Sequence, residues 1–303
     1  MDQGPIFGVV ILTYNSEEVI IQCVCAVKSA LGAVSHEVVV VDNASQDDSA
    51  ALVERTFTDV KVVRTGANLG YARGNNVGGR YLATRDCRYI AFVNPDVTVG
   101  PSTLQTMQDV ADRYGDAGCI GGIAIHNGKR IERSFRTKPT YLEKIILYSN
   151  SRDLPLLRTI LAGITKRLEK RHFISLNTTQ PVYAVSGACI VFPCSAYKKI
   201  DGFDERTFLF QEEFIISERL RQVGLLVYGC PEATYEHIHG HSVGQRLLRA
   251  QRIFIDSEQY LIRTYYRWNW FQRGLMLIVR YLDWFMNACF VRINQVIKRI
   301  ASP

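Results

Sequence analysis

Short apolar runs rich in Val, Ile and Phe recur through the first part of the chain, each followed by a polar loop or by a stretch with helical spacing. They lie at residues 7–12, 37–41, 60–63, 89–93 and 119–125. Runs without polar alternation are typical of strands that are buried on both faces of a parallel sheet. The pattern therefore predicts an α/β fold of right-handed βαβ units, with helices flanking a mostly parallel sheet.

Two local features mark where expected elements begin or are interrupted. The helix after the first strand is expected to begin at Ser16, which would cap free backbone N–H groups. Glu17 and Glu18 would then lie in its first turn and complement the helix dipole. A further strand is expected at residues 181–192. It contains Gly187, and a glycine inside a strand often marks the close approach of a ligand.

The run at residues 89–93 ends in Asn94-Pro95-Asp96. The residue before a proline avoids the helical region, and proline has no N–H for the sheet, so the strand should end in an extended turn. The carboxylate of Asp96 would then lie at the carboxyl edge of the sheet, where open α/β sheets bind ligands. A carboxylate there suits a divalent cation that contacts a phosphorylated ligand. An aspartate that only stabilises a turn is the alternative interpretation.

A Gly- and Asn-rich segment at residues 68–76 leads into the next expected helix. Such a segment can bring backbone N–H groups, together with the side chain of Arg73, close to a phosphate. Its sequence does not match GxGxxG, so it does not indicate a dinucleotide site.

Two further groups of side chains are candidates for chemistry. Glu212 and Glu213 enter an expected helix, where acidic residues can simply complement the dipole. His237, His239 and His241 alternate, so on a strand they would face the same way and could bind a metal ion. Surface histidine clusters also occur without a ligand, so neither group identifies a site alone.

Composition narrows the class of protein. The 303 residues are 47% apolar, enough for a full α/β core. The eight cysteines form no CxxC pair and are expected to be core residues in a reducing compartment. The N-terminus does not resemble a secretion signal, so a cytoplasmic location is expected. A formal net charge of +7 favours an anionic partner, which could be nucleic acid, acidic lipid or a phosphorylated substrate.

Two amphipathic segments help to choose among these partners. In the first, apolar residues recur at helical spacing, and the Lys and Arg side chains fall mainly on the other side of the expected helix. The apolar residues are Leu154, Leu157, Leu161, Ile164 and Leu168. This pattern predicts a basic amphipathic helix, which could be a solvated surface helix or could lie on a membrane.

The second amphipathic segment is a long helix expected at residues 271–300. Its narrow polar stripe consists of Arg273, Arg280, Asn287, Asn294 and the nearby Lys298. No uncharged stretch reaches the roughly 20 residues that span a bilayer, so this helix should lie in the membrane interface or pack on a partner. Nearby tryptophans and arginines suit an anionic membrane surface. Because the basic residues lie among many aliphatic ones, we expect a membrane rather than nucleic acid as the partner.

Several motifs, taken in order, resemble a known family. They are VVILTYN, VVVVDNAS, NLGYARGNN, FVNPDV, VSGACIVF, GFDE, FLFQEEF and HIHGHS. Together they look like a family 2 glycosyltransferase with the GT-A fold, and most like its bacterial rhamnosyltransferase branch. The resemblance covers about residues 8–243. It implies a catalytic domain at 1–250 with a basic amphipathic insert at about 140–176, followed by a membrane-associating segment at 251–303.

The resemblance implies a nucleotide-sugar site. Asp96 matches the last position of the family's DxD-type element, whose first position is Asn94 here. It would bind Mg²⁺ or Mn²⁺, and His237 or His239 would help to complete the metal site. The residues expected to contact the donor are Thr13, Asn15, Asp42, Asn68, Gly70, Arg73, Asn94, Asp96 and Gly187.

The resemblance also implies a catalytic base. Glu212-Glu213 matches the family's Glu-Asp pair, and the second residue, Glu213, would take the proton from an acceptor hydroxyl in a single inverting displacement. Glu212 is the alternative base. The chain departs from the family pattern at Gln211, which replaces a usual aromatic residue, and at Ile215, where another acidic residue is often found.

The implied function is metal-dependent transfer of a sugar to a glycan or lipid-linked glycan acceptor, at the cytoplasmic face of the membrane, in bacterial surface polysaccharide synthesis such as that of O antigen. The implied donor is dTDP-L-rhamnose, with UDP-hexoses as the alternative. A catalytically degenerate scaffold of the same pathway is a second alternative. A nucleotidyltransferase would require a Gly-rich, basic phosphate loop after the first strand, and residues 13–16 offer none.

Overall fold

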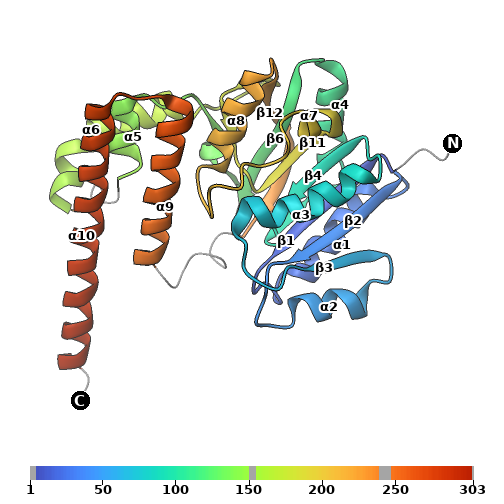
Figure 1. The fold of residues 1–303 in the computed structure, drawn as a ribbon, viewed down its shortest axis with the longest axis horizontal. Coiled ribbons are helices and arrows are strands. Elements are labelled where there is room, and N and C mark those ends of the chain that lie inside the picture. Colours follow the sequence, from blue (N-terminus) through green and yellow to red (C-terminus); the bar gives the residue numbers. More distant parts are fainter. Residues whose placement is uncertain (1–4, 150–154, 239–246, 302–303) are drawn as a thin grey trace. The chain divides into compact units, whose positions relative to one another are not determined.

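A computed structural model of the chain describes residues 5–149, 155–238 and 247–301 (Figure 1). The chain divides into two compact units. Unit 1 comprises the described residues of Met1–Thr137 and Phe173–Ser242, and unit 2 those of Lys138–His172 and Val243–Pro303. The segment inserted in the middle of the sequence and the C-terminal segment therefore belong to the same unit.

Unit 1 is built on a mixed sheet whose strands follow the order β3-β2-β1-β4-β11-β6-β12-β5. The first four run parallel, β11 is antiparallel to both of its neighbours, and β6 and β12 are again parallel. The bounds are β1 Phe7–Thr13, β2 His36–Asp42, β3 Val60–Arg64, β4 Tyr89–Val93, β5 Val97–Val99, β6 Ala117–His126, β11 Cys189–Pro193 and β12 Leu226–His237. The mostly parallel α/β architecture expected from the apolar runs is confirmed.

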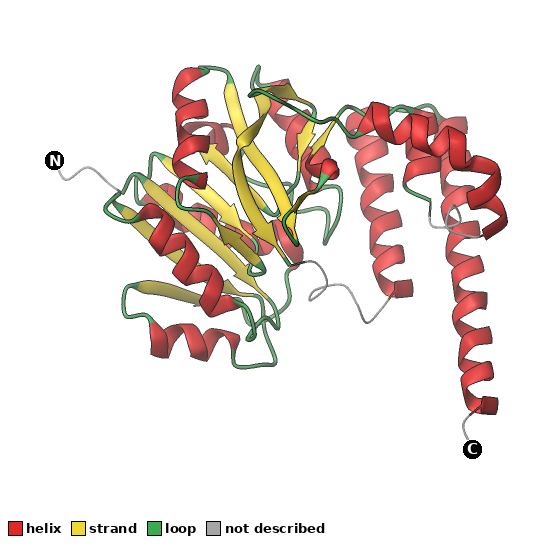
Figure 2. Ribbon diagram, turned by 180° about the vertical axis from the view of Figure 1, so that it is seen from behind, coloured by secondary structure: helices red, strands yellow, loops and turns green. Residues whose placement is uncertain are grey.

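Helices cover both faces of this sheet (Figure 2). Their bounds are α1 Ile20–Leu31, α2 Ser49–Thr56, α3 Gly70–Thr84, α4 Thr103–Arg113, α7 Cys194–Lys199 and α8 Glu212–Gln222. Side chains of α1, α2 and α4 pack in one core layer, and side chains of α3, α7 and α8 pack in the other. Val9 and Ile11 of β1 face the first layer, whereas Val10 faces the second. Burial on both faces explains why the strand sequences show no polar alternation.

Short strands complete unit 1 at the sheet margins and beside it. β7 Lys129–Arg130 pairs with β6, and β9 Gln180–Val182 pairs with β12. A separate pair consists of β8 Phe135–Arg136 and β10 Ala184–Val185, with a 3-10 turn at Glu132–Ser134 before it. The strand expected at residues 181–192 is therefore three strands, because β9, β10 and β11 each have a different partner.

The expectation that α1 begins at Ser16 is wrong. The helix begins at Ile20, and no side chain caps it. The carbonyl of Ser16 instead accepts the N–H groups of Val19 and Ile20 at 3.1 and 2.9 Å. Glu17 and Glu18 therefore precede the helix, and its first turn contains no acidic residue.

Unit 2 is helical. It consists of α5 Tyr141–Leu147, α6 Pro155–His172, α9 Leu247–Leu261, a π-helical stretch at Ile262–Tyr266 and α10 Trp270–Ala301. The helices expected at residues 154–168 and 271–300 are present as α6 and α10, although Leu154 lies outside the described residues. Within the described ranges, no helix has both the length and the apolar content needed to cross a bilayer.

Candidate functional site

The carboxyl ends of β1 and β2 bring two of the expected donor residues together. Thr13 and Asp42 are register partners at the last position of these strands, and both are buried. Within the described part of the chain the Thr13 hydroxyl makes no hydrogen bond, whereas Asp42 Oδ1 accepts the N–H of Ser45 at 3.0 Å. A buried hydroxyl without a partner is rare enough to indicate a site that a ligand completes.

Asn15 links the loops that follow the same two strands. It has a left-handed backbone, with φ of 53°. Its Oδ1 accepts the N–H of Gln46 at 2.7 Å, and its own N–H donates to Ser45 Oγ at 3.1 Å. Asn15 also lines a polar hollow of about 220 Å³ together with Ser16, Glu17, Glu18, Val19 and Asp47. The structure therefore places Asn15 beside Thr13 and Asp42, at the edge of an open space.

Asn68 and Gly70 shape the start of α3. The side chain of Asn43, which sequence reasoning missed, bonds to Asn68 Oδ1 at 3.1 Å, to the Gly70 carbonyl at 3.2 Å and to the Leu69 N–H at 2.9 Å. Gly70 has φ of +81°, and a Cβ there would lie 2.2 Å from the Phe208 carbonyl oxygen. Gly70 is therefore required by the contact between α3 and the loop that precedes α8.

Arg73 lies on the first turn of α3 and is largely exposed. Its Nε donates to the Glu205 carbonyl at 3.1 Å and lies 3.9 Å from Glu205 Oε2. The guanidinium is thus held against the loop after α7, with 56% of its side chain exposed to solvent.

Asp96 and His237 meet because β5 pairs with β12. The register places Val97 opposite His237, and the Ile238 N–H donates to the Asp96 carbonyl at 3.1 Å. Asp96 Oδ1 is buried, accepts no hydrogen bond from the residues that the structure describes, and lies 3.3 Å from His237 Nε2. The N–H of Asn94 is held by the Ala188 carbonyl at 2.8 Å. His239 lies outside the described residues.

This pair of side chains fits a divalent cation. A buried carboxylate oxygen without a hydrogen bond and a nearby imidazole nitrogen are both metal ligands. Among the residues that the structure describes, no third His, Cys, Asp or Glu completes a cluster. A cation here would therefore need oxygen atoms from water or from a bound phosphate, which is how Mg²⁺ is commonly held.

The acidic pair at the start of α8 follows a strained turn. Phe210 and Gln211 have φ of 74° and 70°, which residues other than glycine rarely adopt. Each such residue costs about 1–3 kcal/mol, and such residues cluster at functional sites. The turn fixes the direction in which Glu212 and Glu213 leave the loop.

Glu212 and Glu213 have different surroundings. Glu212 is buried and its Oε1 accepts no hydrogen bond. Burial raises the pKa of the Glu212 carboxyl to about 8, and the neighbouring charge of Glu213 acts in the same direction. Glu212 is therefore protonated at neutral pH. The Glu213 side chain is 23% exposed, so it can reach a ligand in solvent.

Two groups contact the Glu213 carboxylate, and Tyr71 holds one of them. Glu213 Oε1 lies 3.5 Å from Arg136 Nη1 and 3.4 Å from the Gly187 N–H nitrogen. The Tyr71 hydroxyl donates to the Gly187 carbonyl at 2.8 Å. Burial raises the pKa of Tyr71 well above its ordinary value, and the two glutamates add to the shift, so the phenol remains a donor. A Cβ on Gly187 would lie 3.4 Å from Glu213 Cγ, which is an ordinary van der Waals contact, so this packing does not require a glycine.

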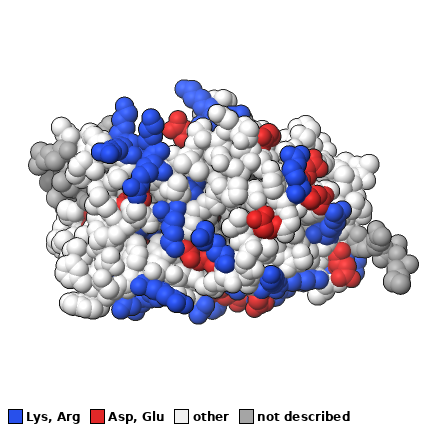
Figure 3. Space-filling view, turned by 90° about the horizontal axis from the view of Figure 1, so that it is seen from above, with Lys and Arg blue, Asp and Glu red and all other residues white. Residues whose placement is uncertain are grey.

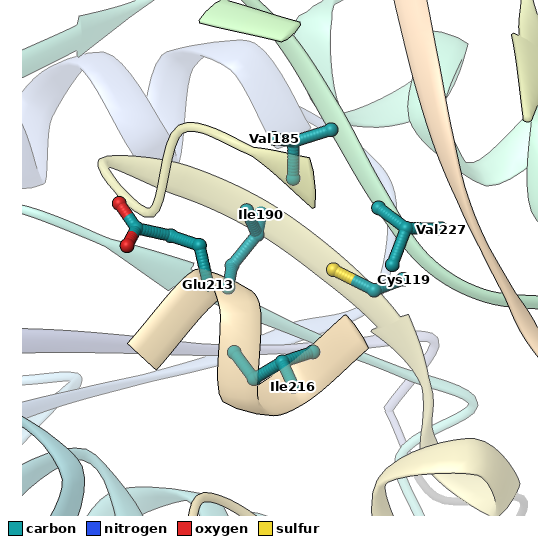
Figure 4. Close-up of a pocket in the computed structure, with 6 residues that line it drawn as sticks. All are labelled: Cys119, Val185, Ile190, Glu213, Ile216 and Val227. Carbon is teal, nitrogen blue, oxygen red and sulfur yellow. The ribbon is translucent and has the colours of Figure 1, made fainter. Parts of the chain in front are cut away.

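The cavity beside Glu213 is not a substrate pocket. Figure 4 shows the Glu213 carboxylate pointing away from the apolar side chains of Val185, Ile190, Ile216 and Val227. The cavity volume is about 10 Å³, which is room for about one water molecule. The reactive end of Glu213 therefore faces away from this cavity.

Arg136 and Tyr71, like Asn43, are site residues that sequence reasoning missed. Tyr71 lies inside the NLGYARGNN motif, so its position was available as a signal. Arg136 lies on the two-residue strand β8, in a stretch without periodicity. Nothing in the sequence pattern places it beside Glu213.

Comparison with known proteins agrees with this geometry. The family model "Glycosyl transferase family 2" matches residues 8–200. An N-acetylglucosaminyl-diphospho-decaprenol L-rhamnosyltransferase of Mycobacterium tuberculosis is 27% identical over 216 residues, covering 69% of this chain and 68% of that protein. The low-salt glycan biosynthesis hexosyltransferase Agl10 of Haloferax volcanii is 24% identical over 318 residues, covering 98% of this chain and 92% of that protein.

Solved structures share the fold. S. aureus TarS 1–349 in complex with UDP-GlcNAc has a TM-score of 0.53 and 18% identity, with 92% of this chain and 72% of that chain covered. GalNAc-T7 with UDP, GalNAc and Mn²⁺ has a TM-score of 0.57 and 14% identity, with 86% and 48% covered. The sheet edge with its acidic and histidine side chains thus lies on a GT-A fold. The chain belongs to glycosyltransferase family 2, and it is a glycosyltransferase.

Proposed function

We propose that the protein is an inverting, metal-dependent rhamnosyltransferase that moves L-rhamnose from dTDP-L-rhamnose to a lipid-linked glycan acceptor during synthesis of a bacterial surface polysaccharide. The observation that carries the proposal is the buried Asp96 oxygen, without a hydrogen bond and 3.3 Å from His237 Nε2, in a chain of this family. The M. tuberculosis relative, whose name states a rhamnosyltransferase with a diphospho-decaprenol acceptor, supports the sugar and the acceptor class.

Asp96 and His237 would hold Mg²⁺ or Mn²⁺, with His239 as a further candidate ligand. When bound, the cation offsets the negative charge of the nucleoside diphosphate that leaves. The GalNAc-T7 structure with UDP and Mn²⁺ supports a divalent ion in this fold.

The nucleoside would lie at the ends of β1 and β2. The Thr13 hydroxyl has no hydrogen-bond partner among the described residues, and Asp42 can accept from a ribose or base donor. Asn15 borders the polar hollow beside them. Asn68 and Gly70 would position the start of α3, and Arg73, Asn94 and Gly187 complete the expected donor set.

Glu213 would act as the base. Its carboxylate takes the proton of an acceptor hydroxyl while that oxygen bonds to the anomeric carbon and the bond from this carbon to the diphosphate oxygen breaks. One displacement inverts the configuration. Glu212 cannot take a proton at neutral pH because its raised pKa keeps it protonated. Arg136 and the Gly187 N–H would aim the Glu213 carboxylate.

We place the enzyme at the cytoplasmic face of the membrane as a peripheral protein. Lipid-linked acceptors lie in the bilayer, so an enzyme that uses them must work at its surface. The exposed apolar face of α10, described in the next subsection, supports this location.

A thermal-shift panel tests the proposal. The full chain is heated with dTDP-L-rhamnose, UDP-glucose and UDP-GlcNAc, each with and without Mn²⁺. A ligand at a hundredfold excess over its Kd stabilises the folded state by about 2.7 kcal/mol. We expect a Mn²⁺-dependent shift with dTDP-L-rhamnose that Asp96→Ala abolishes.

The matched control is Asp86→Ala, because that side chain is 85% exposed and lies outside the site. This variant should keep the full shift. A shift with a UDP-hexose alone would change the donor, and the hexosyltransferase Agl10 relative makes that the second candidate. No shift with any donor, in protein that unfolds cooperatively, would favour the degenerate scaffold.

A further inference from the structure

The interior of unit 2 contains charged side chains. Arg280 of α10 donates to Glu258 of α9 at 2.6 and 3.2 Å and to the Lys144 carbonyl of α5 at 2.6 Å. Lys144 Nζ lies 3.5 Å from Glu258, and Arg280 lies 3.8 Å from Asp283. These four side chains are at most 6% exposed. An ionic network therefore joins α5, α9 and α10.

The opposite face of α10 is apolar and exposed. The residues that face solvent are Phe271 (61% exposed), Leu275 (38%), Ile278 (58%), Leu282 (56%) and Phe285 (61%), with Trp270 (78%) at the start of the helix. The inward face of the same helix carries Met276, Arg280 and Asp283. The polarity of α10 is thus inverted relative to a surface helix of a water-soluble protein, which faces its apolar stripe inward.

The charges near this face suit an anionic surface. Arg263 and Arg267 are exposed just before Trp270 and Phe271. Tryptophan beside arginine is typical of the membrane–water boundary, where the ring lies at headgroup level and the cation meets lipid phosphate. Figure 3 shows Lys and Arg spread over one side of the molecule with acidic residues among them, in line with the net charge of +7.

A second copy of the chain is the other possible occupant, because the exposed residues recur at the spacing of a coiled-coil seam. In a coiled coil, charged residues beside the seam select the partner. The positions beside this seam are Gln272, Gly274, Val279, Tyr281, Met286 and Ala288, none of them charged. An apolar face this wide, with large aromatic residues in the seam, fits lipid better than one partner helix.

We propose that the outward face of α10, from Trp270 to Phe285, is the surface with which this protein docks on an anionic lipid bilayer, and that the buried network holds this face outward. The proposal specifies the membrane part of the proposed function and rests on it for its biological setting. Vesicle binding is measured without donor or acceptor, so either proposal can fail while the other holds.

The experiment is co-sedimentation of the full chain with vesicles of phosphatidylglycerol and phosphatidylcholine, compared with phosphatidylcholine alone. The test variant is Ile278→Asp combined with Leu282→Asp. Both side chains are more than half exposed, so the fold should survive, and thermal unfolding checks this. We expect the wild type to bind the anionic vesicles and the variant to lose at least tenfold in affinity.

The matched control is Ile164→Asp on α6, an apolar residue of unit 2 that is 50% exposed. It should bind like the wild type. Loss of binding in Ile164→Asp with retention in the α10 variant would overturn the proposal and assign the role to α6. So would a wild type that forms a dimer in light scattering, ignores vesicles and becomes monomeric in the α10 variant.

Discussion

The two units of this protein treat buried charge in opposite ways. In unit 1 the core layers on both faces of the sheet are apolar, and the buried carboxyls include Asp96, just after β4, and Glu212, at the start of α8. In unit 2 the ions lie inside, around Arg280 and Glu258, and large apolar side chains lie outside. In unit 1, a buried carboxyl without a hydrogen-bond partner indicates a site that binds a ligand or takes part in catalysis. In unit 2, the buried charges are paired with one another, which fits our proposal that the apolar outer face of this unit docks on a membrane.

Glu212 and Glu258 make the difference concrete. Both side chains are buried. Among the described residues no Lys or Arg pairs with Glu212, and burial and the charge of Glu213 raise its pKa so that it is neutral instead, since burying an unpaired charge costs more than protonating it. Glu258 is surrounded by Arg280 and Lys144. Glu212 is therefore a carboxyl that can change its protonation state near neutral pH. The contacts of Glu258 instead hold α5, α9 and α10 together.

The largest expected effect is on catalysis in unit 1. Glu213→Gln removes the proton acceptor, so transfer should fall by about 10²–10⁴-fold while the Mn²⁺-dependent thermal shift with donor remains. Glu212→Gln keeps a neutral hydrogen-bonding group at the buried position and should lower transfer much less. Steady-state assays with a polyprenyl-diphosphate-linked GlcNAc acceptor measure both. If Glu212→Gln were the more damaging of the two, the assignment of the base would be wrong.

The next effect is on the stability of unit 2. Arg280→Met leaves Glu258 and Asp283 buried without their main cation, which should lower the free energy of unfolding by about 3–5 kcal/mol. All three tryptophans lie in unit 2, at positions 268, 270 and 284. Tryptophan fluorescence in a urea titration therefore reports this unit alone.

The control for Arg280 is Arg252→Met. Arg252 pairs with Asp256 on the same helix and is 54% exposed, so its loss should cost about 0–1 kcal/mol. A further variant replaces Lys144, Glu258 and Arg280 together by methionine. With Asp283 also replaced by methionine, so that all four members of the network are apolar, this variant should regain much of the lost stability, because apolar residues can replace a buried ionic network when no charge is left unpaired. Equal losses for Arg280→Met and Arg252→Met would contradict the proposed importance of burial.

The sequence predicts the part of this architecture that depends on local pattern. The apolar runs locate β1, β2, β4 and β6 because burial on both faces leaves a continuous signature, whereas β3 lies at the end of the sheet and only its first residue, Val60, is buried. Asn94-Pro95 predicts that Asp96 lies at a strand end, because proline constrains its neighbours wherever it occurs. The amphipathic spacing of α6 and α10 likewise depends on neighbours one helical turn away.

Contacts between segments that lie far apart in the sequence are harder to predict from it. The meeting of Asp96 with His237 depends on the β5–β12 register, and the contact of Arg136 with Glu213 depends on a two-residue strand. For a similar reason, the sequence does not show that α10 turns its apolar face to solvent and its charged residues inward. Its polar stripe was visible in the sequence, but only the positions of Glu258 and Lys144 show that Arg280 faces inward.

A further expected effect separates the two kinds of buried carboxyl by their response to pH. Folded Glu212 holds its proton up to a pKa of about 8, whereas the unfolded chain releases it near the ordinary value of 4.5. Between these values unfolding releases a proton, so the contribution of Glu212 to stability is full below about pH 4.5 and is lost as the pH rises toward 8. Glu212→Gln cannot titrate, so its stability relative to the wild type should rise across that window, by at most about 1.4 kcal/mol per unit of pKa difference.

Urea titrations of the wild type and Glu212→Gln at intervals from pH 4 to 9, followed by far-ultraviolet circular dichroism, measure this difference. Glu258→Gln is the comparison. Its carboxyl group contacts Arg280 and Lys144, so the substitution removes a buried ion pair and should destabilise the protein at every pH in the window instead of stabilising it progressively. A difference between Glu212→Gln and the wild type that stays constant with pH would mean that Glu212 is ionised in the folded protein. Glu212 would then compete with Glu213 as the base.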